Sequence, residues 1–181
     1  MWRLLLQSHW RPPPSGSVAQ SELWIDHYDL NVAAANGFEI RAADDGSQYP
    51  VPVTPEAQVI ADEYPLVYDI LVTPYGYSER VGNCGMSYIA AYRYGDGQHV
   101  DINTGFSVSA PVTSRSWSVQ LAGLAGIRHF PLSGGASPAT WGTSKNYIEY
   151  SSGGSAHVTV GSYVMLTTGA ICYAYEPTTT F

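Results

Sequence analysis

The chain has 181 residues, enough for one domain that buries a core of its own. Charged residues make up only 13% of it, about half the usual share of a soluble domain, so we expect other subunits to cover much of its surface. There are 8 basic against 15 acidic residues and no basic stretch, which disfavours nucleic-acid binding and genome packaging by a basic arm.

The apolar run at residues 1–6 is too short for a signal peptide, and no run approaches the roughly 18 apolar residues of a membrane-spanning helix. Cys84 and Cys172 are far apart in the sequence and predict no disulfide framework. These features favour synthesis in a reducing cytosol without membrane insertion. We find no motif for a cofactor.

The N-terminal part begins with a predicted strand at residues 2–6. Residues 10–17 contain three consecutive prolines, which predict an extended arm because proline lacks an N–H donor and blocks helix formation. Residues 21–30 are ambiguous, since charged residues interrupt the apolar spacing. We therefore divide the chain into an N-terminal strand and arm at residues 1–36, either separate from or part of the main domain, and a β-sandwich at residues 37–181.

Residues 37–41 alternate as a strand does, and Asp45-Gly46 predicts a turn after them. Prolines confine residues 48–55 to an edge strand or a linker. Residues 55–63 predict a helix capped by the preceding threonine, although a strand is the alternative. Residues 66–72 predict a buried strand.

A hairpin is predicted across Ser87–Asn103, with Asp96-Gly97 as a type I′ turn. Residues 146–176 predict an antiparallel meander with one buried face. We expect one set of its alternating side chains to share that face: Ile148, Tyr150, Val158, Val160, Ile171, Tyr173 and Tyr175. The pattern as a whole predicts an all-β antiparallel sandwich or jelly roll, with an extended Pro-rich N-terminal segment and at most one short helix.

A metal site is one hypothesis, because carboxylate and imidazole groups recur in two short stretches. Asp26, His27 and Asp29 form the first, and His99 and Asp101 form the second, on one face of a strand. The alternative is an ordinary solvated sheet face, which we favour, so no metal ligand is assigned.

Catalysis is a second hypothesis. Cys84 lies in a tight turn that would expose a nucleophilic thiol, given a histidine base, whereas Cys172 resembles a small buried apolar residue. A pair of acids, as in glycoside hydrolases, has candidates in residues 44–45 and 62–63. A turn explains the first pair of acids better, and a helix end or loop the second, so we assign no catalytic residue and expect a protein that is not an enzyme.

Aromatic side chains are the third candidate, either as stacking platforms for sugar rings or as ordinary sheet and subunit-interface residues. The set is Tyr75, Tyr77, Tyr88, Tyr92, Tyr94, Trp117 and Trp141.

Residues 147–176 resemble the closing strands of jelly-roll domains in fibre-tip, tail and head-decoration proteins of tailed phages. Residues 2–6 with 21–25 resemble the first strands of discoidin-like modules in phage tail proteins. The resemblance implies a virion protein made in the host cytoplasm that assembles as trimers or rings with other virion proteins, and in some cases binds a cell-surface glycan. It carries over no functional residue.

The sequence therefore predicts a self-assembling structural component of a virus particle, with a carbohydrate-binding module and a small hydrolase on a sandwich as the alternatives. We expect the Pro-rich arm and the C-terminal end to dock on neighbouring subunits. The residues of this predicted assembly arm are Trp10, Arg11, Pro12, Pro13, Pro14 and Phe181.

Overall fold

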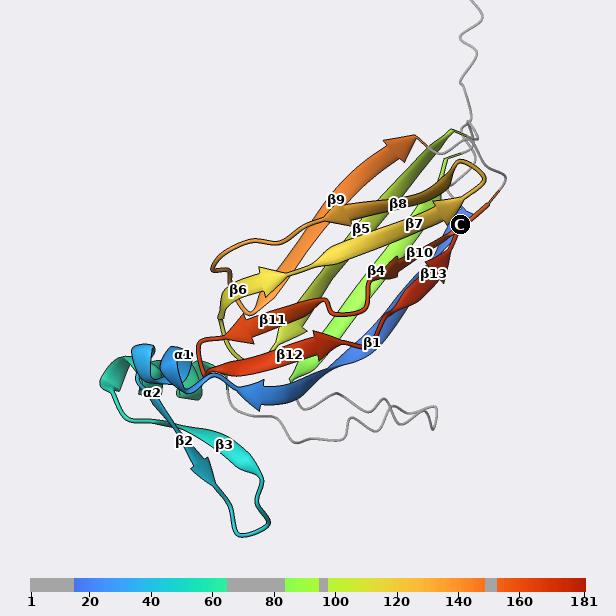
Figure 1. Ribbon diagram of the computed structural model, residues 1–181. Coiled ribbons are helices and arrows are strands. Elements are labelled where there is room, and N and C mark those ends of the chain that lie inside the picture. Colours follow the sequence, from blue (N-terminus) through green and yellow to red (C-terminus); the bar gives the residue numbers. More distant parts are fainter. Residues whose placement is uncertain (1–14, 65–83, 95–97, 149–152) are drawn as a thin grey trace, which may run out of the picture.

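Figure 1 shows the computed structural model, which describes residues 15–64, 84–94, 98–148 and 153–181. The predicted all-β sandwich is confirmed, but the described residues contain two helices, so the expectation of at most one is wrong. The elements are β1 Ser15–Tyr28, α1 Leu30–Ala35, β2 Phe38–Ala42, β3 Gln48–Pro52, α2 Pro55–Glu63, β4 Gly85–Arg93, β5 His99–Val108, β6 Val112–Ser116, β7 Ser118–Gly123, β8 Gly126–Pro131, β9 Thr140–Ile148, β10 Ser155–Val158, β11 Tyr163–Leu166, β12 Ala170–Ala174 and β13 Thr178–Thr180.

Two antiparallel sheets pack face to face. One has seven strands in the order β6-β11-β12-β1-β4-β5-β9, and the other has four in the order β13-β10-β7-β8. In Figure 1 the four-stranded sheet lies across the front of β5, β4 and β1. The apolar residues between the sheets form one buried cluster, as expected for a sandwich.

The long strand β1 lies inside the seven-stranded sheet, between β12 and β4. Residues 15–28 therefore belong to the sandwich, although part of this segment was expected to be an arm. Leu23 points into the core and Trp24 points outward. A register shift between Ile25 and His27 then breaks the alternation, which explains why the sequence of this strand has no clean period.

Strands β6 and β7 follow each other directly and join the two sheets, since β6 pairs with β11 while β7 pairs with β8 and β10. The residue between them, Trp117, is 1% exposed. Its indole Nε1 donates to Thr104 Oγ1 on β5 at 3.1 Å, and its ring contacts Phe106 with centroids 5.5 Å apart. The change of sheet is thus held by a buried aromatic residue whose polar atom is satisfied.

The predicted hairpin over residues 87–103 is confirmed as β4 and β5, while its turn at residues 95–97 lies outside the described residues. Ile89 and Ala91 point into the core. Tyr88 and Tyr92 point to the other face of the sheet. Their register partners on β5 are Gly105 and Asp101, respectively. The tyrosines of β4 therefore line the outside of the sandwich.

The C-terminal stretch is not a single meander. Strand β9 is the edge of the seven-stranded sheet, β10 belongs to the four-stranded sheet, and only β11 and β12 form a consecutive hairpin. The predicted faces are also partly wrong. Val158 is buried but Val160 is 77% exposed, and β12 contributes Ala170, Cys172 and Ala174 to the core cluster, whereas Tyr173 is 37% exposed.

Residues 29–64 form a projecting unit of α1, β2, β3 and α2 at one end of the sandwich (Figure 1). The predicted helix is confirmed as α2, whose Thr54 Oγ1 accepts a hydrogen bond from Ala57 N at 3.2 Å. Within the described ranges the Pro-rich strand β3 pairs only with β2, as predicted for an edge. This unit holds seven acidic residues and one basic residue, so its net charge of −6 accounts for most of the chain's −7.

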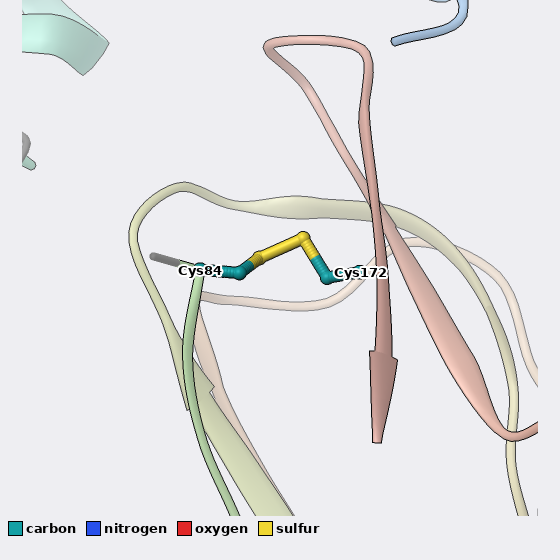
Figure 2. The surroundings of a disulfide bond; sticks show 2 residues. All are labelled: Cys84 and Cys172. Atoms are coloured by element: carbon teal, nitrogen blue, oxygen red, sulfur yellow. A yellow bond between two sulfur atoms is a disulfide. The ribbon is translucent and has the colours of Figure 1, made fainter. Parts of the chain in front are cut away.

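Figure 2 shows a disulfide between Cys84 and Cys172, with Cα atoms 6.2 Å apart. The expectation of unpaired cysteines is therefore wrong. Cys84 precedes β4 and Cys172 lies in β12, so the bond joins the two neighbours of β1. Both residues are at most 1% exposed. Cysteines 88 positions apart meet here because the sheet order, not the sequence, makes them neighbours.

The predicted strands at residues 2–6 and 66–72 lie outside the described residues. No helix in the described part of the chain has both the length and the hydropathy needed to cross a bilayer.

Candidate functional site

The outer face of the seven-stranded sheet is the side turned away from the four-stranded sheet. Along each strand, every second side chain points to this outer face: on β5, Val100 is fully buried in the core while Asp101 is on the outside. We divide this face into two halves. One is formed by β6, β11, β12 and β1, and the other by β4, β5 and β9.

The first half carries three aromatic residues side by side on adjacent strands, which we call the aromatic row: Trp24, Tyr173 and Tyr163. Trp24 is opposite Tyr173, and Tyr173 is opposite Tyr163. The two tyrosine rings are 5.5 Å apart between centroids. Trp24 is 43% exposed and Tyr173 37% exposed, with Ile171 and Met165 paired alongside them. The row is therefore an apolar strip across three strands.

The second half is centred on Tyr88 of β4. Its register partner on β5 is Gly105, and the partner of Gly105 on the edge strand β9 is Gly142. A Cβ atom at Gly142 would lie 2.5 Å from the Tyr88 hydroxyl, and one at Gly105 would lie 2.9 Å from Tyr88 Cε1. Because both positions lack a side chain, the ring of Tyr88 extends from β4 across β5 as far as β9.

Polar side chains flank this ring on both sides along β5 and β9. On one side the Ser144 hydroxyl donates to Asn103 Oδ1, and on the other Ser107 and Thr140 have their hydroxyl oxygens 3.4 Å apart. All four belong to the register pairs two positions before and two positions after the Gly105–Gly142 pair, which are the next pairs on the same face. The ring thus lies between two rows of hydroxyl and amide groups.

Asp101 lies one register step further along the same half. Its carboxylate accepts from Asn146 Nδ2 at 2.6 Å and from the Tyr94 hydroxyl. With a partner on each oxygen, this carboxylate is held in place.

The structure separates the seven aromatic candidates. Tyr88 and Tyr92 lie on the outer face, and Tyr94 donates to Asp101 at the end of β4. Trp117 is in the core, where a ligand at the surface does not reach it. Trp141 is half-buried beside Phe106 and has the Arg115 guanidinium 4.3 Å from its ring centroid. The remaining two, Tyr75 and Tyr77, lie outside the described residues.

The two halves of the hypothetical metal site are at opposite ends of the sheet. His27 is near the end of β1, whereas His99 begins β5, close to the strand end where Ser15 is opposite Arg93. His27 Nδ1 lies 2.7 Å from Asp26 Oδ2, and Asp29 caps α1 by accepting from two backbone N–H groups. No cluster of three or more metal-ligating residues occurs among the residues described.

The catalytic candidates Cys84, Asp45 and Asp62 are engaged in a disulfide or in hydrogen bonds. The sulfur of Cys84 is bonded to Cys172 and is not a free thiol. Asp45 accepts from the Ser47 hydroxyl at 2.6 Å and from its backbone N at 2.9 Å. These bonds lower the pKa of the Asp45 carboxyl, the hydroxyl contributing most. Asp62 accepts from Gln58 one turn earlier on the surface of α2.

Of the predicted assembly arm, residues 10–14 lie outside the described residues, and the C-terminal end docks on its own chain. Phe181 packs against the core cluster and exchanges two backbone hydrogen bonds with Gly154, each 3.1 Å. The Thr179 hydroxyl donates to the backbone oxygen of Ser17 at 2.7 Å. Contacts within the chain therefore hold the Thr-rich end against the sandwich, and its docking on neighbouring subunits stays a prediction.

The described residues form two cavities where the projecting unit meets the sandwich. One, of about 290 Å³, lies between the end of β1 and the β2–β3 turn and is lined in part by the bonded Asp26–His27 pair. The other, of about 170 Å³, is bordered mainly by apolar side chains of β2, β3 and α2, with Tyr64 beside them. Desolvation raises the pKa of the Tyr64 hydroxyl, with a further contribution from the neighbouring Glu63.

The aromatic row was missed at the sequence level because Trp24 on β1 is far in the chain from Tyr163 and Tyr173 on the hairpin of β11 and β12. Apolar residues at both alternate positions of β12 gave no signal as to which side is buried. In comparisons with known proteins, no protein family model, no curated protein and no solved structure matches the chain.

Proposed function

We propose that this protein is a non-enzymatic structural component that assembles with copies of itself, and that it does so in a virus particle. The observation that carries the proposal is the aromatic row of Trp24, Tyr173 and Tyr163, exposed on the outer face of the seven-stranded sheet.

The row has the composition of a subunit interface. Aromatic residues and methionine are enriched where subunits meet, because they bury much apolar area for few rotatable bonds. Trp24 and Tyr173 remain substantially exposed in the single chain, and Met165 extends the apolar strip. A contiguous apolar strip of this kind, partly exposed on a sheet face, favours contact with another protein surface.

A second copy suits this surface better than a charged partner. In a two-fold contact each residue meets the same surface on the other subunit, so like charges are brought together. The row itself carries no charge, and the charged residues described nearest to it on β1 are Glu22 and the Asp26–His27 pair. Most of the negative charge is on the projecting unit instead.

Two further features support a structural role in a particle. Three of the candidate catalytic groups are engaged in structure: Cys84 in a disulfide, Asp45 in a turn and Asp62 in a hydrogen bond with Gln58 on α2. A buried disulfide also suits a protein that works outside the reducing cytosol, as on a virion surface. The virus particle as the setting rests on the resemblance of residues 147–176 to phage jelly-roll proteins.

The experiment is sedimentation velocity from low to high micromolar concentration, on the wild type and on a Trp24→Ser, Tyr173→Ser variant. We expect the wild type to form a defined oligomer. Replacing a central interface aromatic weakens the free energy of association by roughly 2 kcal/mol for each residue, so the variant should be monomeric over the same range.

Ile127→Ser is the matched control, because Ile127 is a 65% exposed apolar residue of β8, in the other sheet. This variant should sediment as the wild type does. The proposal is refuted by a wild type that stays monomeric throughout, or by an oligomer that survives in the variant of the row.

A further inference from the structure

We propose that the half of the outer face formed by β4, β5 and β9 binds a neutral glycan, with one pyranose ring stacked on Tyr88. This site goes beyond the assembly role and lies on strands other than those of the aromatic row, so both surfaces can act in the same molecule.

The ring of Tyr88 is presented as a platform rather than packed in the core. It is on the outer side of β4, and it reaches across Gly105 to Gly142. At Gly142 the atom that would meet a Cβ first is the Tyr88 hydroxyl, at 2.5 Å, while the nearest backbone atom is 3.6 Å away. The lack of a side chain at Gly142 therefore makes room for Tyr88 in particular. At Gly105 the backbone of β9 also approaches closely, so a side chain is excluded there by the β9 backbone as well as by Tyr88.

A tyrosine ring lying across a sheet offers one face to a ligand. The C–H groups of a pyranose pack against such an electron-rich face, which gives affinity without requiring a charge. Neighbouring rows on the same face of a sheet are about 7 Å apart, since each residue advances the strand by about 3.3 Å. A sugar ring centred on Tyr88 therefore has its hydroxyl groups near the rows on both sides.

The groups in those rows suit sugar hydroxyls. Asn103 and Ser144 lie on one side, and Ser107 and Thr140 on the other. Hydroxyl and amide groups both donate and accept, as sugar hydroxyls do. Asp101, held by Asn146 and Tyr94, supplies a fixed acceptor one step further along for a second sugar unit.

The charge of the surface selects neutral glycans over anionic ones. Among its described residues, the outer face of β4, β5 and β9 presents neither lysine nor arginine: Arg93 and Lys145 belong to the opposite alternation, opposite Val100 and Ile102. A sialylated or sulfated sugar would meet the Asp101 carboxylate, and neither a lysine nor an arginine among the described residues of this face would pair with it. We therefore expect discrimination against both.

The test is saturation-transfer difference NMR of the full chain with a panel of neutral oligosaccharides ending in glucose, galactose, mannose or N-acetylglucosamine, and with sialyllactose as the anionic probe. We expect transfer to ring C–H groups of at least one neutral probe and none to sialyllactose. Tyr88→Ala should weaken the affinity about tenfold or more, whereas Tyr88→Phe should retain most of it.

Two variants keep the result interpretable. Tyr173→Ala removes an aromatic from the row and should bind the probe as the wild type does. Gly142→Ala should displace the Tyr88 hydroxyl and weaken binding with the ring still present. The proposal is overturned if no neutral probe binds, if sialyllactose binds best, or if Tyr88→Ala and Gly142→Ala both bind as the wild type does. Because self-association is measured separately by sedimentation, either proposal can fail alone.

Discussion

Removing the Cys84–Cys172 disulfide should produce the largest loss of stability that the structure allows us to calculate. The bond closes a loop of 88 residues in the unfolded chain. The chain-entropy relation gives about 15 cal/mol/K for such a loop, or about 4.6 kcal/mol at room temperature. Both sulfurs are buried, so substitution also leaves core atoms without contacts. We expect Cys84→Ala with Cys172→Ala to lower the free energy of unfolding by about 4–5 kcal/mol.

The assay is urea unfolding followed by tryptophan fluorescence, on the wild type with and without reductant and on the double variant. For a domain of this size, a loss of about 1 kcal/mol in the free energy of unfolding lowers the melting temperature by about 2–4 °C. A thermal melt should therefore show a fall of roughly 10–15 °C. Reductant should destabilise the wild type to a similar extent and leave the double variant unaffected. The double variant is thus the control for any general effect of the reductant.

Two results would refute this reasoning. One is a wild type whose unfolding midpoint does not respond to reductant after full unfolding and refolding. The other is labelling of both cysteines when the unreduced, unfolded protein is alkylated and weighed. Either would mean that the cysteines are neighbours in the fold without being bonded.

The remaining predictions concern the hydrogen bonds of single side chains. Thr104→Val keeps the shape of the side chain but removes the acceptor of the buried Trp117 indole N–H and the donor to the Tyr88 backbone oxygen, which should cost about 1–3 kcal/mol in urea unfolding; an unchanged midpoint would contradict it. Thr179→Val removes the donor to the Ser17 backbone oxygen, so the amides of β13 should exchange hydrogen faster while those of β4 do not change. The Asp45 carboxyl has a lowered pKa in the folded state, so its contribution to stability is present above the ordinary aspartate pKa and is lost as the pH falls through the folded value. Ser47→Ala should therefore raise the Asp45 pKa measured by NMR titration, and an unaltered value would count against this account.

Elements with local signals could be predicted from the sequence. Thr54 and Pro55 mark the start of α2, and Asp45-Gly46 forms the turn between β2 and β3, with Gly46 at a φ of +82°. Alternation identified β4 and β5 as a hairpin. In each case the residues that determine the structure lie within a few positions of one another.

The elements that could not be predicted depend on distant contacts or on an ambiguous pattern. The register shift between Ile25 and His27 hides the period of β1. In β12 both alternate sets are apolar, and the smaller set around Cys172 enters the core because the bond to Cys84 and the close packing between the sheets leave little room there. Patterns read along one strand do not contain this information.

The candidate site shows the same division. That Tyr88 and Tyr92 share a strand face follows from their spacing and is confirmed. The aromatic row needs the order β1-β12-β11, in which the first strand lies next to strands from the end of the chain. The sequence therefore supplied the residue types of an interface but not their arrangement.

The most direct measurement of the central claim is the native mass of the intact, oxidised protein at micromolar concentration. Our account predicts a discrete multiple of the 19.6 kDa chain mass that reverts to the single chain when the aromatic row is replaced by serine. A single mass of 19.6 kDa at every concentration, with Trp24 fully accessible to an aqueous quencher, would contradict it.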